Sequence, residues 1–359
     1  MDVQTPRFSA ARILVILFRQ IGDVLLTTPL VRALRQHYPE STIMFLTEPS
    51  PARVLAHNPF LDDVLIRPRH LSWRQELQLL RQIRQLRFDL VVDVMGNSRS
   101  TAIAYFSRAR HRVAFAHFPR SLFYSIRVDG RPDIREYTVK KRLRLLEPLG
   151  IQPTDLALDF VYAPGDQEEV ERFLAQHRIR QDDLLICIDP THHIPTRQWP
   201  ATCFSQLADQ LHERLGARVV LLWGPGEKAY VQGVATAADS APVLIPEWGL
   251  SPLAALLNRA DVLIGCDSAP LHIAVSQRTP TLSIHGSTSD LGWLPPLPQH
   301  RGVRLGLPCQ PCGQAQCGPP LDIACLRTLP VDTVFDALLA LRPWVPKFPR
   351  LPERLRERD

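Results

Sequence analysis

A carboxylate follows the first apolar segment of the chain at a spacing suited to a reactive site. Six apolar residues at 13–18 are followed by a short polar turn and Gly22-Asp23, after which the apolar spacing becomes helical. Gly22 would allow a ligand to approach the backbone closely, and Asp23 could take a proton from an attacking hydroxyl. Asp is also favoured at helix starts, where it accepts backbone hydrogen bonds and complements the helix dipole. The residues alone leave both a base and a cap open for Asp23.

Two turns in the second half of the chain have the composition of a phosphate site. The first, Gly265-Cys-Asp-Ser-Ala-Pro-Leu-His272, follows an apolar strand and begins a helix. Backbone N–H groups at that helix start, together with Ser268 and His272, suit a diphosphate, although Ser268 could equally be a simple N-cap. The second turn carries Gly286, Ser287 and Thr288. Two small polar turns so close in sequence favour a phosphate pocket.

Two further strand ends carry charged candidates. Arg197, in Arg-Gln-Trp-Pro after an irregular loop, could clamp a phosphate. Glu227, in Trp-Gly-Pro-Gly-Glu, could hold ribose hydroxyls, or it could be the acidic first turn of a helix.

Four of the seven cysteines are clustered in a loop rich in Pro and Gly. They follow the spacing C-x2-C-x4-C-x7-C, which comprises Cys309, Cys312, Cys317 and Cys325. In a reducing compartment such spacing favours a structural zinc or iron ion over disulfides, with free thiols as the alternative. A site closed by four thiolates has no open position for catalysis, so this ion is not assigned to the chemistry and no catalytic metal is expected there.

Charge is distributed unevenly along the 359 residues, whose net charge is +6. Residues 1–160 hold 24 Lys and Arg against 15 Asp and Glu, whereas the remainder holds 18 against 21. A basic half attracts anionic ligands or surfaces, although an ordinary solvated surface explains it equally well. No apolar run approaches a membrane span and the start lacks a signal-peptide core, so a cytoplasmic protein is expected. No recognition motif for nucleic acid is present, so nucleic acid is not expected as a partner.

Alternating strand and helix patterns predict the scaffold that positions these residues. Two α/β series flank a polar linker at 152–164, so two parallel sheets covered by helices are expected. We assign a first domain to 1–160, a second to 161–342 that includes the four-Cys loop (309–325), and a basic C-terminal tail to 343–359. A frayed tail is favoured there, with a packed crossover as the alternative. The first domain is expected to contain one helix over 24–37.

Taken in order, these motifs resemble those of the family 9 glycosyltransferases, the lipopolysaccharide heptosyltransferases. The resemblance rests on Arg19-Gln-Ile-Gly-Asp23 through Thr27-Thr28-Pro29, on Arg197-x-Trp199-Pro200 and Trp223-Gly224, and on Asp267-Ser268-x-Pro270-x-His272. The ordered Cys cluster followed by Leu326 adds to it. The resemblance implies the GT-B fold, two Rossmann-like doubly wound domains facing a central cleft.

The resemblance also implies an activity, which is inverting transfer of a heptose from ADP-heptose to a sugar hydroxyl of the lipopolysaccharide inner core. Asp23 matches the general base, which makes the base the favoured role for this residue. The donor would be held by Arg197, where the family usually has Lys, by Glu227, and by Asp267, Ser268 and His272. Arg19, Gly22 and Thr27 would lie on the acceptor side. Ala269 stands where the family usually has Gly, which leaves the donor sugar open.

The basic first half then becomes the acceptor domain, facing anionic core sugars and making peripheral contact with the inner face of the inner membrane. The alternative is a non-catalytic GT-B protein, stabilised by metal and used for binding or assembly, or a family member with another nucleotide-sugar or acceptor.

Overall fold

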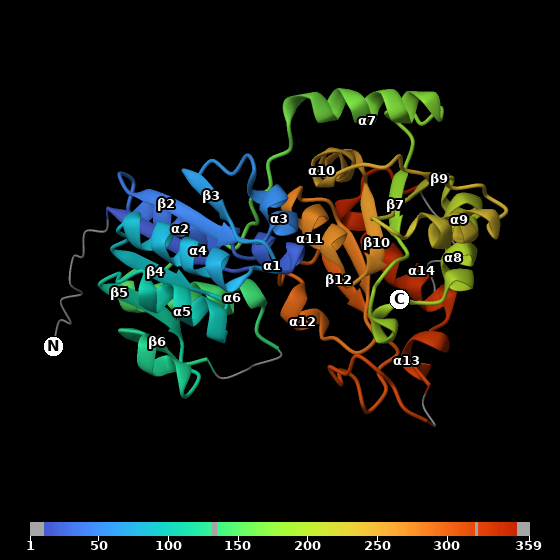
Figure 1. Ribbon diagram of the computed structural model, residues 1–359. Helices are drawn as coiled ribbons and strands as arrows, with labels where there is room; N and C mark the ends of the chain where they lie inside the picture. Colours follow the sequence, from blue (N-terminus) through green and yellow to red (C-terminus); the bar gives the residue numbers. More distant parts are fainter. Residues whose placement is uncertain (1–10, 131–134, 320–321, 350–359) are drawn as a thin grey trace. The chain divides into compact units, whose positions relative to one another are not determined.

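The chain divides between Val161 and Tyr162 into two compact units, each with a six-stranded parallel sheet (Figure 1). The structure is a computed structural model that describes residues 11–130, 135–319 and 322–349. The two α/β units confirm the fold class that the alternating pattern predicted.

The sheet of the N-terminal unit has the strand order β3-β2-β1-β4-β5-β6. Its central strand β1 pairs on one side with β2 and on the other with β4, so the strand order reverses at β1. Ligands of open α/β sheets bind at the carboxyl ends of the strands beside such a reversal. The strands are β1 (Arg12–Ile16), β2 (Thr42–Thr47), β3 (Asp63–Ile66), β4 (Leu90–Asp93), β5 (His111–Phe115) and β6 (Ile126–Val128).

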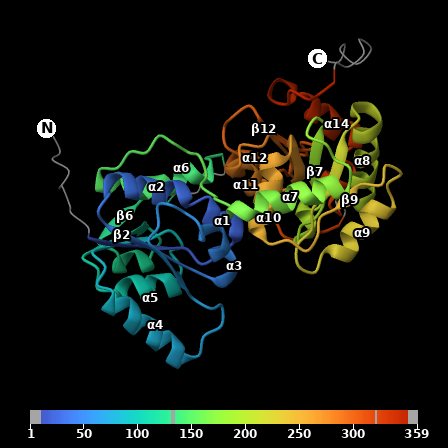
Figure 2. The same cartoon turned by 90° about the horizontal axis from the view of Figure 1, so that it is seen from above.

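Helices cover both faces of this sheet, as Figure 2 shows. They bury a core of aliphatic side chains in which residues 13–16 of β1 are fully buried. The helices are α1 (Ile21–Leu25), α2 (Thr28–His37), α3 (Pro49–Ala52), α4 (Trp73–Gln85), α5 (Ser98–Phe106) and α6 (Thr138–Leu143). The 3₁₀ helices are η1 (Arg53–Leu55), η2 (Arg120–Phe123) and η3 (Arg144–Leu149).

The single helix expected over 24–37 is wrong, because α1 ends at Leu25 and α2 begins at Thr28. The hydroxyl of Thr27 donates to the carbonyl of Asp23 (2.9 Å), and that of Thr28 donates to the carbonyl of Leu25 (2.8 Å). Pro29, which has no N–H, lies in the first turn of α2, where none is needed. Asp23 therefore lies on a separate helix of five residues.

The sheet of the C-terminal unit has the order β12-β11-β10-β7-β8-β9, which repeats the topology of the first sheet. Its strand order reverses between β7 and β10, so their carboxyl ends lie side by side. The strands are β7 (Leu185–Asp189), β8 (Arg218–Leu221), β9 (Val243–Leu244), β10 (Val262–Cys266), β11 (Thr281–Ile284) and β12 (His300–Val303).

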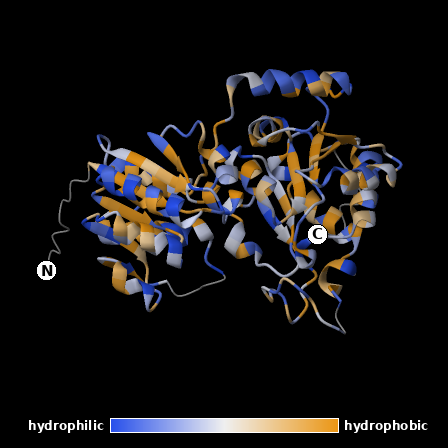
Figure 3. Cartoon of the chain, viewed as in Figure 1, coloured by the Kyte–Doolittle hydropathy of each residue, from blue (hydrophilic) through white to orange (hydrophobic). Residues whose placement is uncertain are grey.

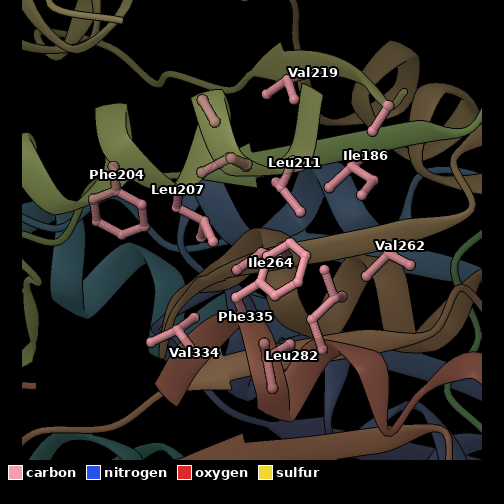
Figure 4. Close-up of a cluster of buried hydrophobic side chains, with 14 of the residues drawn as sticks. Ile186, Phe204, Leu207, Leu211, Val219, Val262, Ile264, Leu282, Val334 and Phe335 are labelled. Atoms are coloured by element: carbon pink, nitrogen blue, oxygen red, sulfur yellow. The ribbon is translucent and has the colours of Figure 1, made fainter. Parts of the chain in front are cut away.

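The core of this unit is formed by helices that pack onto the sheet. Figure 4 shows Leu207 and Leu211 of one helix and Phe335 of another beside Ile264 and Leu282 of the strands. The helices are α7 (Pro164–Gln176), α8 (Ala201–Leu215), α9 (Lys228–Thr236), α10 (Leu250–Arg259), α11 (Ala269–Ser276), α12 (Asp290–Trp293), α13 (Ala324–Arg327) and α14 (Val331–Leu339). The 3₁₀ helices are η4 (Pro195–Arg197) and η5 (Arg342–Trp344).

Residues 343–349 differ from the frayed tail expected over 343–359. Val345 and Phe348 are buried in the core of the C-terminal unit, and the Lys347 ammonium lies 3.1 Å from a carboxylate oxygen of Asp261. These two apolar side chains, three residues apart, anchor this last described segment to the core. The remaining tail positions, 350–359, lie outside the described residues.

Within the described part of the chain, no helix combines the length and apolar character that crossing a bilayer requires.

Candidate functional site

Asp23 is the third residue of α1, at the carboxyl end of β1. One carboxylate oxygen accepts the backbone N–H of Gln20 (3.1 Å), so the capping role is real, although the N-cap position itself is Gln20. The other oxygen lies 2.5 Å from a guanidinium nitrogen of Arg142. The Asp23 side chain is 27% exposed, which leaves the carboxylate open to solvent on one side.

Arg142, on α6, fixes the orientation of this carboxylate. Its side chain is 9% exposed, and it also donates to the carbonyl of Asp23 and to the hydroxyl of Thr27 (2.9 Å). Sequence reasoning missed Arg142, because it lies 119 residues from Asp23 within a Lys-Lys-Arg run typical of a solvated surface. One guanidinium nitrogen thus binds the Asp23 carboxylate and the other binds the backbone carbonyl of the same residue, so the planar group fixes the side chain relative to its own backbone.

The other residues predicted for the acceptor side lie in different environments. Gly22 and Thr27 are buried, and the hydroxyl of Thr27 is used by Asp23 and Arg142. Arg19 is exposed at the start of the same turn. Of these three residues, Arg19 is the one that presents a charge to solvent.

In the C-terminal unit, the two strands beside the reversal each end in an aspartate. Asp189 ends β7, and Asp267 directly follows β10. A side chain at Gly265 would come within 2.8 Å of the Asp189 carbonyl oxygen, so glycine permits the close approach of these strand ends. Sequence reasoning did not select Asp189, although Asp189, like Asp267, is an acid at the end of an apolar strand.

Asp189 accepts hydrogen bonds from both neighbouring turns. The Ser268 hydroxyl donates to one oxygen, and the Thr191 hydroxyl lies 2.9 Å from the other. The same Thr191 oxygen lies 3.0 Å from the Glu227 carboxylate, which also accepts the N–H of Gly224 (2.7 Å). Burial raises the pKa of Asp189 to about 6, against the lowering effect of the Ser268 and Thr191 hydrogen bonds. Ser268 and Glu227 thus belong to one connected polar network.

Arg197 and Asp267 face each other without a hydrogen bond. Their nearest charged atoms are 3.8 Å apart, and Asp267 is nearly buried, whereas the Arg197 side chain is 25% exposed. The Arg197 Nε and the Asp267 Oδ2 have no hydrogen-bond partner among the described residues. Buried polar atoms in this state retain capacity to bind a polar ligand. His272, on α11, is also buried, with its ring 6.0 Å from that of Trp293.

The turn Gly286-Ser287-Thr288 is tightly packed. A side chain at Gly286 would overlap the Thr196 carbonyl and come within 2.7 Å of Leu326. The Ser287 hydroxyl lies 3.1 Å from that of Thr196, and the Thr288 hydroxyl lies 3.1 Å from His285 Nδ1. The side chains of this predicted donor turn therefore bind protein atoms.

The loop that holds the cysteines is attached to this turn. The Gln310 amide donates to the Gly286 carbonyl (2.9 Å), Gly313 N–H donates to the Ser287 carbonyl (2.7 Å), and the Thr196 hydroxyl donates to the Gln314 carbonyl (2.6 Å). These bonds place the cysteine loop directly beside the predicted donor turn.

The four cysteines are free thiols, three of them exposed and Cys325 half-buried. Burial raises the pKa of the Cys325 thiol, and the charges of Cys309, Cys312 and Cys317 raise it further, so each of these three lies within electrostatic reach of Cys325. In the described ranges, no three His, Cys, Asp or Glu side chains are gathered as a metal site. Four thiols are a donor set that suits a thiophilic ion, but in the described part of the chain they are not gathered around one point.

Comparison with known proteins defines the class and then the family. The crystal structure of a family 9 glycosyl transferase from Veillonella parvula has a TM-score of 0.74 at 25% identity, covering 83% of this chain and 86% of that one. The structure of the E. coli ADP-heptose lps heptosyltransferase II has a TM-score of 0.73 at 18% identity, covering 92% and 98%. The fold is therefore that of the GT-B glycosyltransferases.

At the level of sequence, the family model of glycosyltransferase family 9 (heptosyltransferase) matches residues 76–320. Lipopolysaccharide heptosyltransferase 3 of Escherichia coli K12 is 29% identical over 290 residues, which are 77% of this chain and 83% of that protein. The chain belongs to glycosyltransferase family 9 and is a glycosyltransferase, which confirms the resemblance of its motifs.

Proposed function

We propose that this protein transfers a heptose from ADP-heptose to a sugar hydroxyl of the lipopolysaccharide inner core, with inversion at the anomeric carbon. The observation that carries the proposal is the Asp23 carboxylate, oriented by Arg142 and the Gln20 N–H yet open to solvent. The names of the relatives, lipopolysaccharide heptosyltransferase 3 and ADP-heptose lps heptosyltransferase II, support the donor and the acceptor class.

Asp23 acts as the general base in this proposal. The acceptor hydroxyl loses its proton to Asp23 while its oxygen forms a bond to the anomeric carbon of the donor. The bond from that carbon to the diphosphate oxygen breaks, and ADP leaves with the electron pair. Each carboxylate oxygen of Asp23 retains a lone pair beyond its present hydrogen bond, so the existing contacts do not block proton acceptance.

The C-terminal unit supplies the donor contacts. Arg197 is placed to neutralise the diphosphate as negative charge develops on the leaving group. Ser268 and the N–H groups of the first turn of α11 lie at the same strand end, and the unpartnered Asp267 oxygen can accept a hydrogen bond from a donor hydroxyl. Glu227 is tied to Gly224 and Thr191, which leaves its second oxygen for ribose hydroxyls. Gly286, Ser287 and Thr288 support this site, because Gly286 and Ser287 pack against Thr196, the neighbour of Arg197.

A donor screen tests the proposal. ADP-heptose is expected to raise the melting temperature, because a ligand that binds only the folded state stabilises it, whereas UDP-sugars at equal concentration leave it unchanged. Turnover is then measured on inner-core acceptor that lacks the transferred heptose, with the anomeric configuration of the product read by NMR. Absence of both ADP-heptose binding and transfer would favour a non-catalytic member of the family.

We also propose that Cys309, Cys312, Cys317 and Cys325 hold one structural zinc or iron ion. The support is the electrostatic proximity of the four thiols and the attachment of their loop to the donor turn. A bound ion would cross-link this loop and hold it against Gly286. Elemental analysis after anaerobic, reducing purification is expected to find about one zinc or iron per chain. Metal-free protein with unchanged stability would contradict this assignment.

A further inference from the structure

Five large apolar side chains stand out on one part of the N-terminal unit. This aromatic cluster consists of Tyr105 and Phe106 of α5 together with Phe118, Leu122 and Phe123 in and around η2. Their exposed fractions run from 44% at Phe123 to 83% at Phe118. The ring of Tyr105 lies 5.5 Å from that of Phe106 and 5.3 Å from that of Phe123, so these three rings are contiguous, and Leu122 and Phe118 lie next to them along the chain. Gathered apolar side chains on a surface mark an interaction site more often than scattered ones do.

The cluster is held outward by a buried polar network. Tyr124, next to Phe123, is buried, and its hydroxyl contacts the Asp93 carboxylate (2.5 Å) and the Thr101 hydroxyl (2.9 Å). Asp93 also accepts the N–H groups of Met95 and Gly96. Because Tyr124 takes the inward position, its neighbour Phe123 is directed to solvent. The exposure is therefore a built feature of the fold.

Two arginines fix the same turn from the outside. The Arg112 Nε donates to the carbonyl of Phe123 (2.9 Å), and the Arg120 Nε donates to the carbonyl of Gly96 (3.0 Å). The backbone of Phe123 and the side chain of Arg120, on either side of Leu122, are thus bonded to the rest of the unit.

The surroundings of the aromatic cluster are strongly cationic. Residues 94–128 contain six arginines and no Asp or Glu. Arg99, Arg108, Arg110 and Arg127 are exposed, and none of the six forms an ion pair with a carboxylate in the part of the chain that the structure describes. Figure 3 shows hydrophobic and hydrophilic segments side by side near β6, where this turn lies.

We propose that the aromatic cluster and its arginines dock the protein on an anionic phospholipid bilayer. Aromatic and Leu side chains enter the headgroup boundary, while guanidinium groups pair with lipid phosphates. A second copy of this chain is a poor occupant, because a symmetric contact would bring two sets of uncompensated arginines together. The inference assigns the peripheral membrane contact, which the family resemblance implies, to named side chains, and it holds whichever sugar is transferred.

The experiment is co-sedimentation of the full chain with vesicles. Wild type is expected to bind phosphatidylglycerol–phosphatidylcholine vesicles and to be released by high salt, with little binding to pure phosphatidylcholine. The double variant Phe118→Glu, Leu122→Glu is expected to lose at least about tenfold in vesicle affinity. The matched control Val161→Glu, Leu297→Glu, which changes two exposed apolar residues away from the cluster by the same charge, is expected to bind as wild type does.

A second pair of double variants separates the contribution of the arginines from that of the apolar side chains. Arg108→Glu, Arg110→Glu should weaken binding and its salt dependence, whereas Arg172→Glu, Arg178→Glu should not. The pairs are matched, because all four arginines are exposed and both Arg108 and Arg178 have a positive φ.

Equal affinity of wild type and the Phe118→Glu, Leu122→Glu variant for anionic vesicles would overturn the proposal. So would a wild-type dimer in sedimentation velocity that this variant dissociates, without vesicle binding, which would assign the surface to self-association. ADP-heptose binding, measured on the same variants by thermal shift, is expected to be unchanged. Failure of membrane docking is thereby distinguished from failure of the proposed function.

Discussion

At the scale of single residues, the two chemical centres depend on partners that sequence motifs do not contain. Asp23 is oriented by Arg142, and Ser268 is bound by Asp189. In both cases the motif supplies one member and a distant element supplies the other. The motif therefore locates a candidate group, and the fold determines its orientation.

Arg142 is expected to act as a positioning residue for Asp23. Arg142→Lys keeps a cation but loses the planar fork, so kcat should fall by about 10²-fold while the affinity for ADP-heptose stays the same. Arg144→Lys, two residues away and paired with Glu136, is the control and should keep its kcat. A change in donor affinity equal to the change in kcat would instead indicate a general structural role.

Asp189 is expected to make stability depend on pH. Its pKa of about 6 in the folded state lies above its ordinary value of 3.8, so its contribution is fully present below about pH 4 and is lost as pH rises through 6. The difference corresponds to roughly 3 kcal/mol. In urea unfolding followed from pH 4 to 7, Asp189→Asn should flatten this dependence, whereas the exposed Asp182→Asn should leave it as in wild type.

At the scale of elements, the strands with apolar runs could be predicted from sequence, whereas the edge strands β6 and β12 could not. The central strands β1, β7 and β10 are buried along their whole length apart from the first residue of β1, which gives a strong apolar signal. Both strands contain an exposed Arg, and β12 also contains Gly, so their pairing depends on the neighbouring strand. The division between α1 and α2 depends on side-chain hydrogen bonds of Thr27 and Thr28, which periodicity does not reveal.

Gly286 is expected to be essential for joining β11 to the cysteine loop. Gly286→Ala would force apart the Thr196 carbonyl and the Leu326 side chain, lowering the free energy of unfolding by about 1–3 kcal/mol. Gly233→Ala in α9, where an added side chain meets nothing within 4 Å, should instead stabilise by about 0.5–1 kcal/mol. Chemical denaturation of the two variants checks the prediction. Equal stability of both would show that the turn relaxes freely.

At the scale of the whole molecule, the proposed chemistry is divided between the two units. Asp23 lies in the basic N-terminal unit, and the donor candidates Arg197 and Asp267 lie in the C-terminal unit. We therefore expect that a substitution in the N-terminal unit can abolish transfer without abolishing donor binding.

The most direct test is transfer by Asp23→Asn, measured beside ADP-heptose affinity. Asp62→Asn is the matched control, because Asp62 also pairs with an arginine at 2.5 Å and accepts a backbone N–H. Asp23→Asn is expected to lower kcat by about 10²–10⁴-fold with donor affinity unchanged, whereas the control is expected to retain both kcat and donor affinity. An Asp23→Asn enzyme that transfers heptose at the wild-type rate would contradict the assignment of Asp23 as the base.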